Sequence, residues 1–246
     1  MHSPSEPSPI RQIPMPHLRT NVPHRTKPFE RGPVFAGAVS LAGMAGYINV
    51  VVLGFFNVPV SHMSGAVSRL SIDLTTSNHP DLIVVDSIIG GFLVGAVVSG
   101  IVIGGQKLLP GRRYGLALLM EGGVLAGAVA LLRAGNPLGV ALAAMACGIQ
   151  NGMGSSYRGL DIRTTHVTGT VTDLGVMMGH WIRHRRVPPW KFVMLLGIVT
   201  GFFAGGLTGA LAFRRFGVTA LAFASAGCLA AGTTYFAWLQ RRTARS

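Results

Sequence analysis

The sequence predicts an all-α integral membrane protein, with six transmembrane helices arranged as two inverted three-helix repeats. Three observations lead to this prediction. Only 12% of the 246 residues are charged, about half the share of an ordinary soluble domain. Apolar runs of about 20 residues, the length that crosses a bilayer, recur along the chain. A short polar motif also appears twice, in equivalent places of the two halves.

The two ends of the chain differ from its apolar middle. Residues 1–32 contain seven prolines and no apolar block, so this segment cannot bury enough surface to offset the entropy of ordering it. We expect a disordered, Pro-rich, basic cytoplasmic tail there, and the missing apolar region argues against a signal peptide. Residues 241–246 form a second basic cytoplasmic tail.

Between the tails lie six apolar segments, each about long enough to cross a ~30 Å hydrocarbon core at 1.5 Å per residue. The expected spans are residues 35–55, 82–103, 114–132, 138–153, 192–213 and 217–239. Glycines recur at four-residue spacing in them, as at Gly91 and Gly95. Small residues at this spacing let helices approach closely where lipid is as apolar as the side chains.

Two further stretches, residues 61–77 and 164–182, are helix-like but rich in Ser and Thr. They are too polar to face lipid, so at membrane depth they must be buried in protein or line a cavity. We therefore expect a short polar re-entrant helix after the first span of each repeat.

The distribution of basic residues predicts the orientation. With six spans and the amino end inside, the inside segments hold 17 Lys and Arg and the outside segments hold four, as the positive-inside rule requires. Both ends are then cytoplasmic. The formal net charge is +13, but the basic residues flank the apolar spans and do not alternate with aromatic residues on one face. We therefore expect no nucleic-acid partner.

The two halves resemble each other in three places, in the same order. The paired segments are 46–49 with 148–151, 61–67 with 165–171, and 92–95 with 202–205. The repeats are therefore predicted at residues 33–136 and 137–240. Since each repeat contains three spans, an odd number, the second repeat has the inverted topology relative to the first. In transporters built from inverted repeats, the binding site lies near the midplane of the membrane.

Several residues of the repeated motif are candidates for a substrate-binding site. His62 and His166 are equivalent, but two ligands of one type are too few for a metal, which leaves a local role at the start of a helix or a role as solute ligands. Ser64, Thr165 and Thr168 lie at the start of the short helices, where Ser and Thr are good N-caps. Alternatively, they form an anion-binding site together with the free backbone N–H groups of the helix N-termini. The complete predicted set is Asn49, His62, Ser64, Gly65, Glu121, Gln150, Asn151, Arg163, Thr165, His166, Thr168 and Gly169.

Charged side chains at membrane depth add two hypotheses. Glu121 lies within a span, where an ionisable group is costly and indicates function by default, and we expect it to face the bundle; Arg163 is a candidate partner. Arg69 has two candidate partners: Asp73, four residues later on one helical face, and Asp173, at the equivalent position of the other repeat.

The sequence contains no Ser-His-Asp order, nucleotide-binding loop or paired metal motif, so we expect no enzyme, no cofactor and no metal. Cys147 and Cys228 lie in apolar runs and indicate no disulfide framework.

The two polar elements also resemble those of the YoaK-type family of multi-pass bacterial membrane proteins, defined as a domain of unknown function. The segments that carry the resemblance are 46–49, 62–65, 150–151 and 163–169. The resemblance implies six membrane helices and the bacterial inner membrane, and no established activity. The chain departs from the family pattern at Asn49, where Asp is frequent, and at residues 64–66, which usually read Thr-Gly-Asn.

From these observations we expect a small-solute transporter or exporter with a midplane site between the repeats. The alternative is a non-transporting structural or interaction protein of the membrane. The expected partners are the lipid bilayer and a small solute, with an anion favoured, and a second copy of the chain is a further candidate.

Overall fold

The computed structural model describes residues 31–56, 58–76, 79–103, 112–155, 165–184 and 187–243. In these ranges the protein is helical and contains no strand, which confirms the predicted all-α class. The helices are α1 (Arg31–Phe56), α2 (Met63–Thr76), α3 (His79–Ile103), α4 (Arg112–Arg133), α5 (Leu138–Ser155), α6 (Val167–His184), α7 (Pro189–Phe216), the short 3₁₀ helix η2 (Gly217–Ala220) and α8 (Leu221–Thr243). The predicted disordered tail lies outside the described residues, apart from its last two positions.

Each predicted apolar span falls on a long helix, and each polar stretch falls on one of the two short helices α2 and α6. Among the described residues, four helical segments are long and apolar enough to cross a membrane: Gly32–Phe56, Leu82–Ile103, Arg112–Arg133 and Pro189–Arg241. The last of these, 53 residues long, takes in both α7 and α8. These are the helices of a membrane protein.

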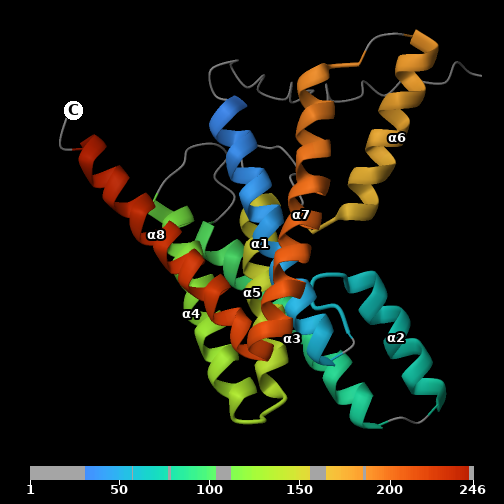
Figure 1. Cartoon of the computed structure of the whole chain (residues 1–246), viewed down its shortest axis with the longest axis vertical. Coiled ribbons are helices and arrows are strands. Elements are labelled where there is room, and N and C mark those ends of the chain that lie inside the picture. Colours follow the sequence, from blue (N-terminus) through green and yellow to red (C-terminus); the bar gives the residue numbers. More distant parts are fainter. Residues whose placement is uncertain are drawn as a thin grey trace, which may run out of the picture.

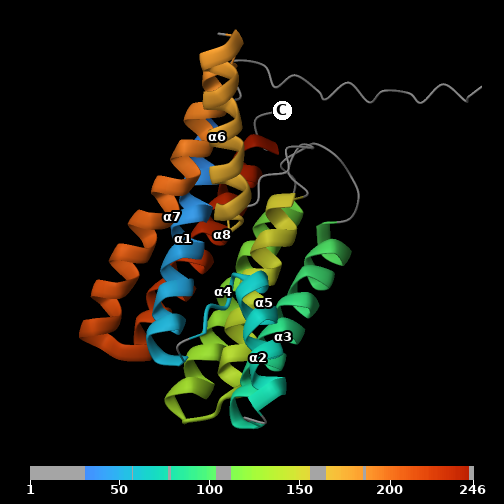
Figure 2. The same ribbon diagram turned by 90° about the vertical axis from the view of Figure 1, so that its right-hand side faces the viewer.

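The short helices occupy opposite ends of the bundle. Both begin near the middle of its height, and from there α2 runs toward one end and α6 toward the other (Figures 1 and 2). Helix α2 rests on α3 and α6 rests on α7, while α2 and α6 do not contact each other. The long helices α1 and α5, which precede them, run in opposite directions (Figure 1).

Four helix pairs form most of the packing: α1 with α7, α3 with α5, α4 with α5, and α4 with α8. The first two pairs are so close that a Cβ atom at Gly46 would overlap the backbone carbonyl of Phe202, and one at Gly148 that of Phe92. Such contact between backbones is how helices associate where the surroundings are apolar. Gly91 and Gly95, which are four residues apart in the sequence, make a close contact of this kind, since both face the backbone of α5.

These contacts predict that alanine is poorly tolerated at Gly148. The added methyl group has no room against Phe92, and overpacking of this kind costs roughly 1–3 kcal/mol. Gly100, on α3, is a matched control because a Cβ atom there meets nothing within 4 Å. Thermal unfolding in detergent should show a lower midpoint for Gly148→Ala and an unchanged or higher one for Gly100→Ala. Equal midpoints for the two variants would contradict the close α3–α5 contact.

Candidate functional site

The chain that leads into α2 is anchored to α1 by a buried asparagine. The Oδ1 atom of Asn49 accepts hydrogen bonds from the backbone N–H of Ser61, at 3.2 Å, and from its Oγ, at 2.9 Å. Both residues are buried. Asn49 therefore satisfies polar groups of a segment that has no helical hydrogen bonds of its own, and buried polar groups need such partners.

The chain that leads into α6 is anchored to α5 in the same way. Thr165 Oγ1 donates to Asn151 Oδ1 at 2.8 Å, and Asn151 Nδ2 donates to the carbonyl of Cys147 at 3.1 Å. Thr165 is buried. The two anchors thus join equivalent residues of the sequence repeat, an asparagine in the first helix and a hydroxyl group just before the short helix.

His62 and His166 begin the two short helices. The carbonyl of His62 accepts from the N–H of Ala66 at 3.1 Å, and that of His166 accepts from the N–H of Thr170 at 3.0 Å. The His62 ring lies edge-on to Phe202 of α7, with centroids 5.7 Å apart. His62 Nδ1 also lies 3.3 Å from Ser61 Oγ, within hydrogen-bond distance. Both histidines therefore occupy the helix-starting position that the sequence suggested.

The two histidine side chains also lie near each other. His62 is half-buried and His166 is exposed. His166 is close enough to His62 for a charge on its ring to act on the His62 ring. The tips of α2 and α6 therefore lie near each other, although the helices themselves diverge.

The remaining predicted motif residues surround these tips. Ser64, Gly65 and Thr168 are exposed, and Gly169 packs against the ring of His166. The carbonyls of Ser64 and Thr168 accept hydrogen bonds from Ser68 and Thr172, one turn later in each helix. Arg163 lies outside the described residues.

Gln150 and Glu121 belong to other parts of the bundle. Gln150 is buried and donates from Nε2 to the carbonyl of Leu41, so it joins α5 to α1. Glu121 is fully buried on α4, beside the thiols of Cys147 and Cys228. This confirms that Glu121 faces the bundle. Since α4 contacts neither α2 nor α6, Glu121 lies apart from the motif residues on those two helices, and its place in a binding site stays a prediction.

The carboxyl of Glu121 is unusual in its surroundings. Within the described ranges, neither oxygen has a hydrogen-bond partner of ordinary geometry, and Cys228 offers only a weak thiol donor. In those ranges, no three His, Cys, Asp or Glu side chains come together in the way that a metal ion would require.

Arg69 pairs with Asp73, at 3.1 Å from Nε to Oδ1. Asp73 is buried on α2 while Arg69 is about half exposed. The local pair is therefore confirmed. Asp173 is exposed on α6, which does not contact α2, so the alternative pair across the repeats is wrong.

Two cavities lie between the helices. One, of about 290 Å³, separates α1 from α4, α5 and α8, and the other, of about 440 Å³, lies between α1, α7 and α8. Neither is lined by residues 61–66 or 165–170. Neither of these two cavities is therefore the one expected between the tips.

Comparison with known proteins identifies the family. The model of the family described as "Protein of unknown function (DUF1275)" matches residues 37–234. The chain belongs to this family. The match extends over both polar elements and every long helix, and it confirms the resemblance that those elements carry. No curated protein matches the chain, and no solved structure does.

Ser61 is part of the site but was not among the predicted site residues. It was present in the repeated motif, opposite Thr165, and that alignment was the signal that could have identified it. Its partner Asn49 was predicted, as were Asn151, Thr165 and both histidines.

The two anchors predict matching energetic couplings. A double-mutant cycle with Asn49→Ala and Ser61→Ala should give a coupling of about 0.5–1.5 kcal/mol in the free energy of unfolding, the usual value of a hydrogen bond. The cycle with Asn151→Ala and Thr165→Ala should give a similar value.

Ser71, whose hydroxyl bonds only to the carbonyl of Val67 on its own helix, provides the control. The cycle that combines Asn49→Ala with Ser71→Ala should show no coupling. Coupling at one anchor and none at the other would mean that the two tips are held differently.

Proposed function

We propose that the protein is a small-solute transporter or exporter of the bacterial inner membrane, with its site at the tips of α2 and α6. In this proposal the chain consists of two inverted three-helix repeats and crosses the bilayer six times, through α1, α3, α4, α5, α7 and α8. The observation that carries it is the matched pair of buried anchors, Asn49 with Ser61 and Asn151 with Thr165.

Reciprocal helix contacts support the inverted repeats. Gly46 of the first repeat faces Phe202 of the second, and the equivalent Gly148 faces Phe92, which is equivalent to Phe202. Contacts of this reciprocal kind arise when a two-fold axis relates two halves. The opposite directions of α1 and α5 indicate an axis in the membrane plane, as in inverted repeats (Figure 1).

The contact between α4 and α8 follows the same rule. Gly122 faces Leu229, and Gly232 faces Leu119. Gly122 and Gly232 are 110 positions apart in the sequence, and so are Leu119 and Leu229. The same separation relates Phe92 to Phe202. All the long helices of the first repeat therefore have a counterpart in the second.

Two features support cytoplasmic ends. The end of α8 lies at the same end of the bundle as the start of α1 (Figure 1). The six-span arrangement assigns 17 basic residues to that side and four to the other, and this excess supports a cytoplasmic location for that end.

The chemistry of the tips supports an anionic solute. Helices α2 and α6 both begin in the interior, where the first backbone N–H groups of a helix have no helical partner. Their positive dipole ends and the two histidines gather donors at one place, and transporters bind anionic groups at such half-helix ends. The sequence offers no catalytic set beside them, so the proposal is transport and not catalysis.

The alternative is a structural or interaction protein of the membrane. It is favoured by the absence of residues 61–66 and 165–170 from the lining of both cavities. In this alternative the anchors only hold α2 and α6 in place, and no solute passes.

Flux through the purified protein in liposomes separates the two functions. Chloride, formate and phosphate serve as probes, and at least one should cross faster than in protein-free liposomes. Thr165→Val and Ser61→Ala should each slow the flux of the transported anion by about tenfold, the effect of losing ~1.4 kcal/mol at the site. The controls are Thr172→Val and Ser71→Ala, whose exposed hydroxyls bond to their own helices. If folded protein moves none of the three anions, anion transport is contradicted.

A further inference from the structure

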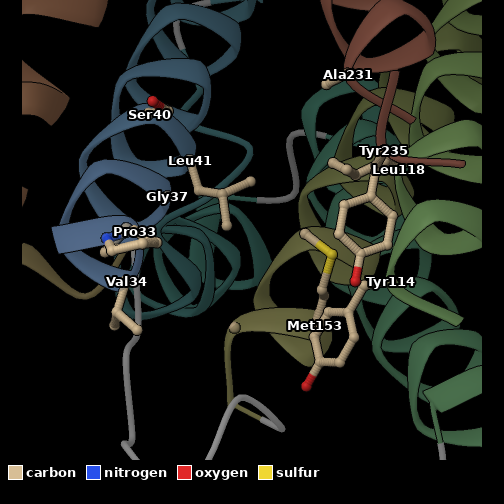
Figure 3. A pocket seen from close by; sticks show the side chains of 12 residues that line it. Pro33, Val34, Gly37, Ser40, Leu41, Tyr114, Leu118, Met153, Ala231 and Tyr235 are labelled. Atoms are coloured by element: carbon tan, nitrogen blue, oxygen red, sulfur yellow. The ribbon is translucent and has the colours of Figure 1, made fainter. Parts of the chain in front are cut away.

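The 290 Å³ cavity is separate from the tips and has a different character. Helix α1 forms one wall, and α4, α5 and α8 form the other. Figure 3 shows Pro33, Val34 and Leu41 on one side, facing Tyr114 and Met153 across the gap. The full lining is Pro33, Val34, Gly37, Ala38, Ser40, Leu41, Tyr114, Leu118, Met153, Gly154, Ala231 and Tyr235.

The lining is almost entirely apolar. Its polar side chains are those of Ser40 and the two tyrosines. The hydroxyls of Tyr114 and Tyr235 point toward the end of the cavity where Val34 lies (Figure 3). A small hydrated anion gains nothing in such a place, because it would lose its water without polar partners. The cavity therefore suits hydrocarbon, and at about twice the ~150 Å³ that accommodates benzene in an engineered core it has room for an alkyl chain.

Charge at the mouth indicates what the hydrocarbon is attached to. The cavity lies at the start of α1 and α4 and at the end of α5 and α8, the end of the bundle that carries the carboxyl terminus. Arg112 and Arg113 open α4 immediately before Tyr114, and Arg241 lies beyond Tyr235 on α8; all three are exposed. The one acidic residue in α1, α4, α5 and α8 is the buried Glu121. The rim is thus positive and has no opposing acidic side chain on these helices.

The start of α4 and the last turns of α8, which carry these arginines, are neighbours. Gly115 of α4 packs against Tyr235 and Phe236 of α8, so the first turn of α4 lies beside the last turns of α8. Arg113 is partly engaged, since Nη1 donates to the carbonyl of Ile103 at 3.1 Å. Arg112 and Arg241, both exposed, lie on α4 and α8 a few residues from this contact.

We propose that this cavity holds one acyl chain of an anionic phospholipid from the adjacent leaflet, with the phosphate at Arg112 and Arg241. Tyrosines at a membrane–water boundary and basic clusters at the cytoplasmic ends of helices are typical of such lipid sites. Because α1 and α8 make only slight contact, we expect the acyl chain of the lipid to enter the cavity between these two helices. The inference needs the membrane location alone and does not depend on transport.

Retention of lipid by the purified full-length protein, measured by native mass spectrometry, tests the proposal. The probes are phosphatidylglycerol, phosphatidylcholine with the same acyl chains, and free oleate. We expect phosphatidylglycerol to bind roughly thirtyfold more tightly than phosphatidylcholine, the effect expected of two basic residues near a headgroup. Equal binding of the two phospholipids, or tighter binding of oleate, would overturn the proposal.

Two matched pairs of variants place the lipid. Gly37→Leu fills the cavity, since a Cβ atom at Gly37 meets nothing within 4 Å; Gly123, on α4 and away from the cavity, is equally open and gives the control Gly123→Leu. The second pair consists of double variants that remove charge. The test variant combines Arg112→Gln with Arg241→Gln, and its control combines Arg214→Gln with Arg215→Gln at the far end of α7. Retention of phosphatidylglycerol should fall only in Gly37→Leu and in the first arginine pair. An equal fall in a variant and its control would reject this site.

Discussion

The proposed arrangement of α2 and α6 depends on how a helix can begin in the middle of a membrane. A chain that enters the bilayer and stops short of the far side carries backbone groups without helical partners, and hydrocarbon offers none. Here the non-helical entry to α2 is held by Asn49 and that to α6 by Asn151. Each asparagine belongs to the long helix that precedes the short one, so α1 and α5 determine where the tips lie. Everything proposed for the tips follows from these two positions.

The long helices provide the rigid frame that the anchors need. Glycines let α1 contact α7 and let α3 contact α5 through their backbones, and these are the helices that carry Asn49 and Asn151 or support α2 and α6. The short helices have little packing of their own, since each leans on one neighbour. A transporter can use this contrast, because a firmly packed frame beside lightly packed tips allows the tips to move while the frame stays intact.

The sequence predicted the elements well because their signals are local. Apolar length identifies a long helix, and the excess of Ser and Thr identifies α2 and α6. The grouping of His62 with His166 was also predictable, since the repeated motif relates the two residues directly. Arg69 and Asp73 were correctly paired from their four-residue spacing.

Other features depended on the rotation and neighbours of whole helices. Glu121 was correctly expected to face inward, but its neighbours come from α5 and α8 and not from the tips. Gln150 stands next to Asn151 in sequence, and yet it points to α1. One step along a helix turns a side chain by about 100°, so adjacent residues serve different interfaces. The apolar cavity joins residues of four helices, and no local pattern marks it.

The central claim is that α2 and α6 enter the membrane from opposite sides, and cysteine labelling tests it most directly. Thr75 and Arg183 lie near the outer ends of α2 and α6 and are exposed, and the native Cys147 and Cys228 can be replaced by Ala. In intact cells, a membrane-impermeant maleimide should react with Thr75→Cys and reach Arg183→Cys only after the membrane is opened. Labelling of both positions from the same side would contradict the inverted arrangement.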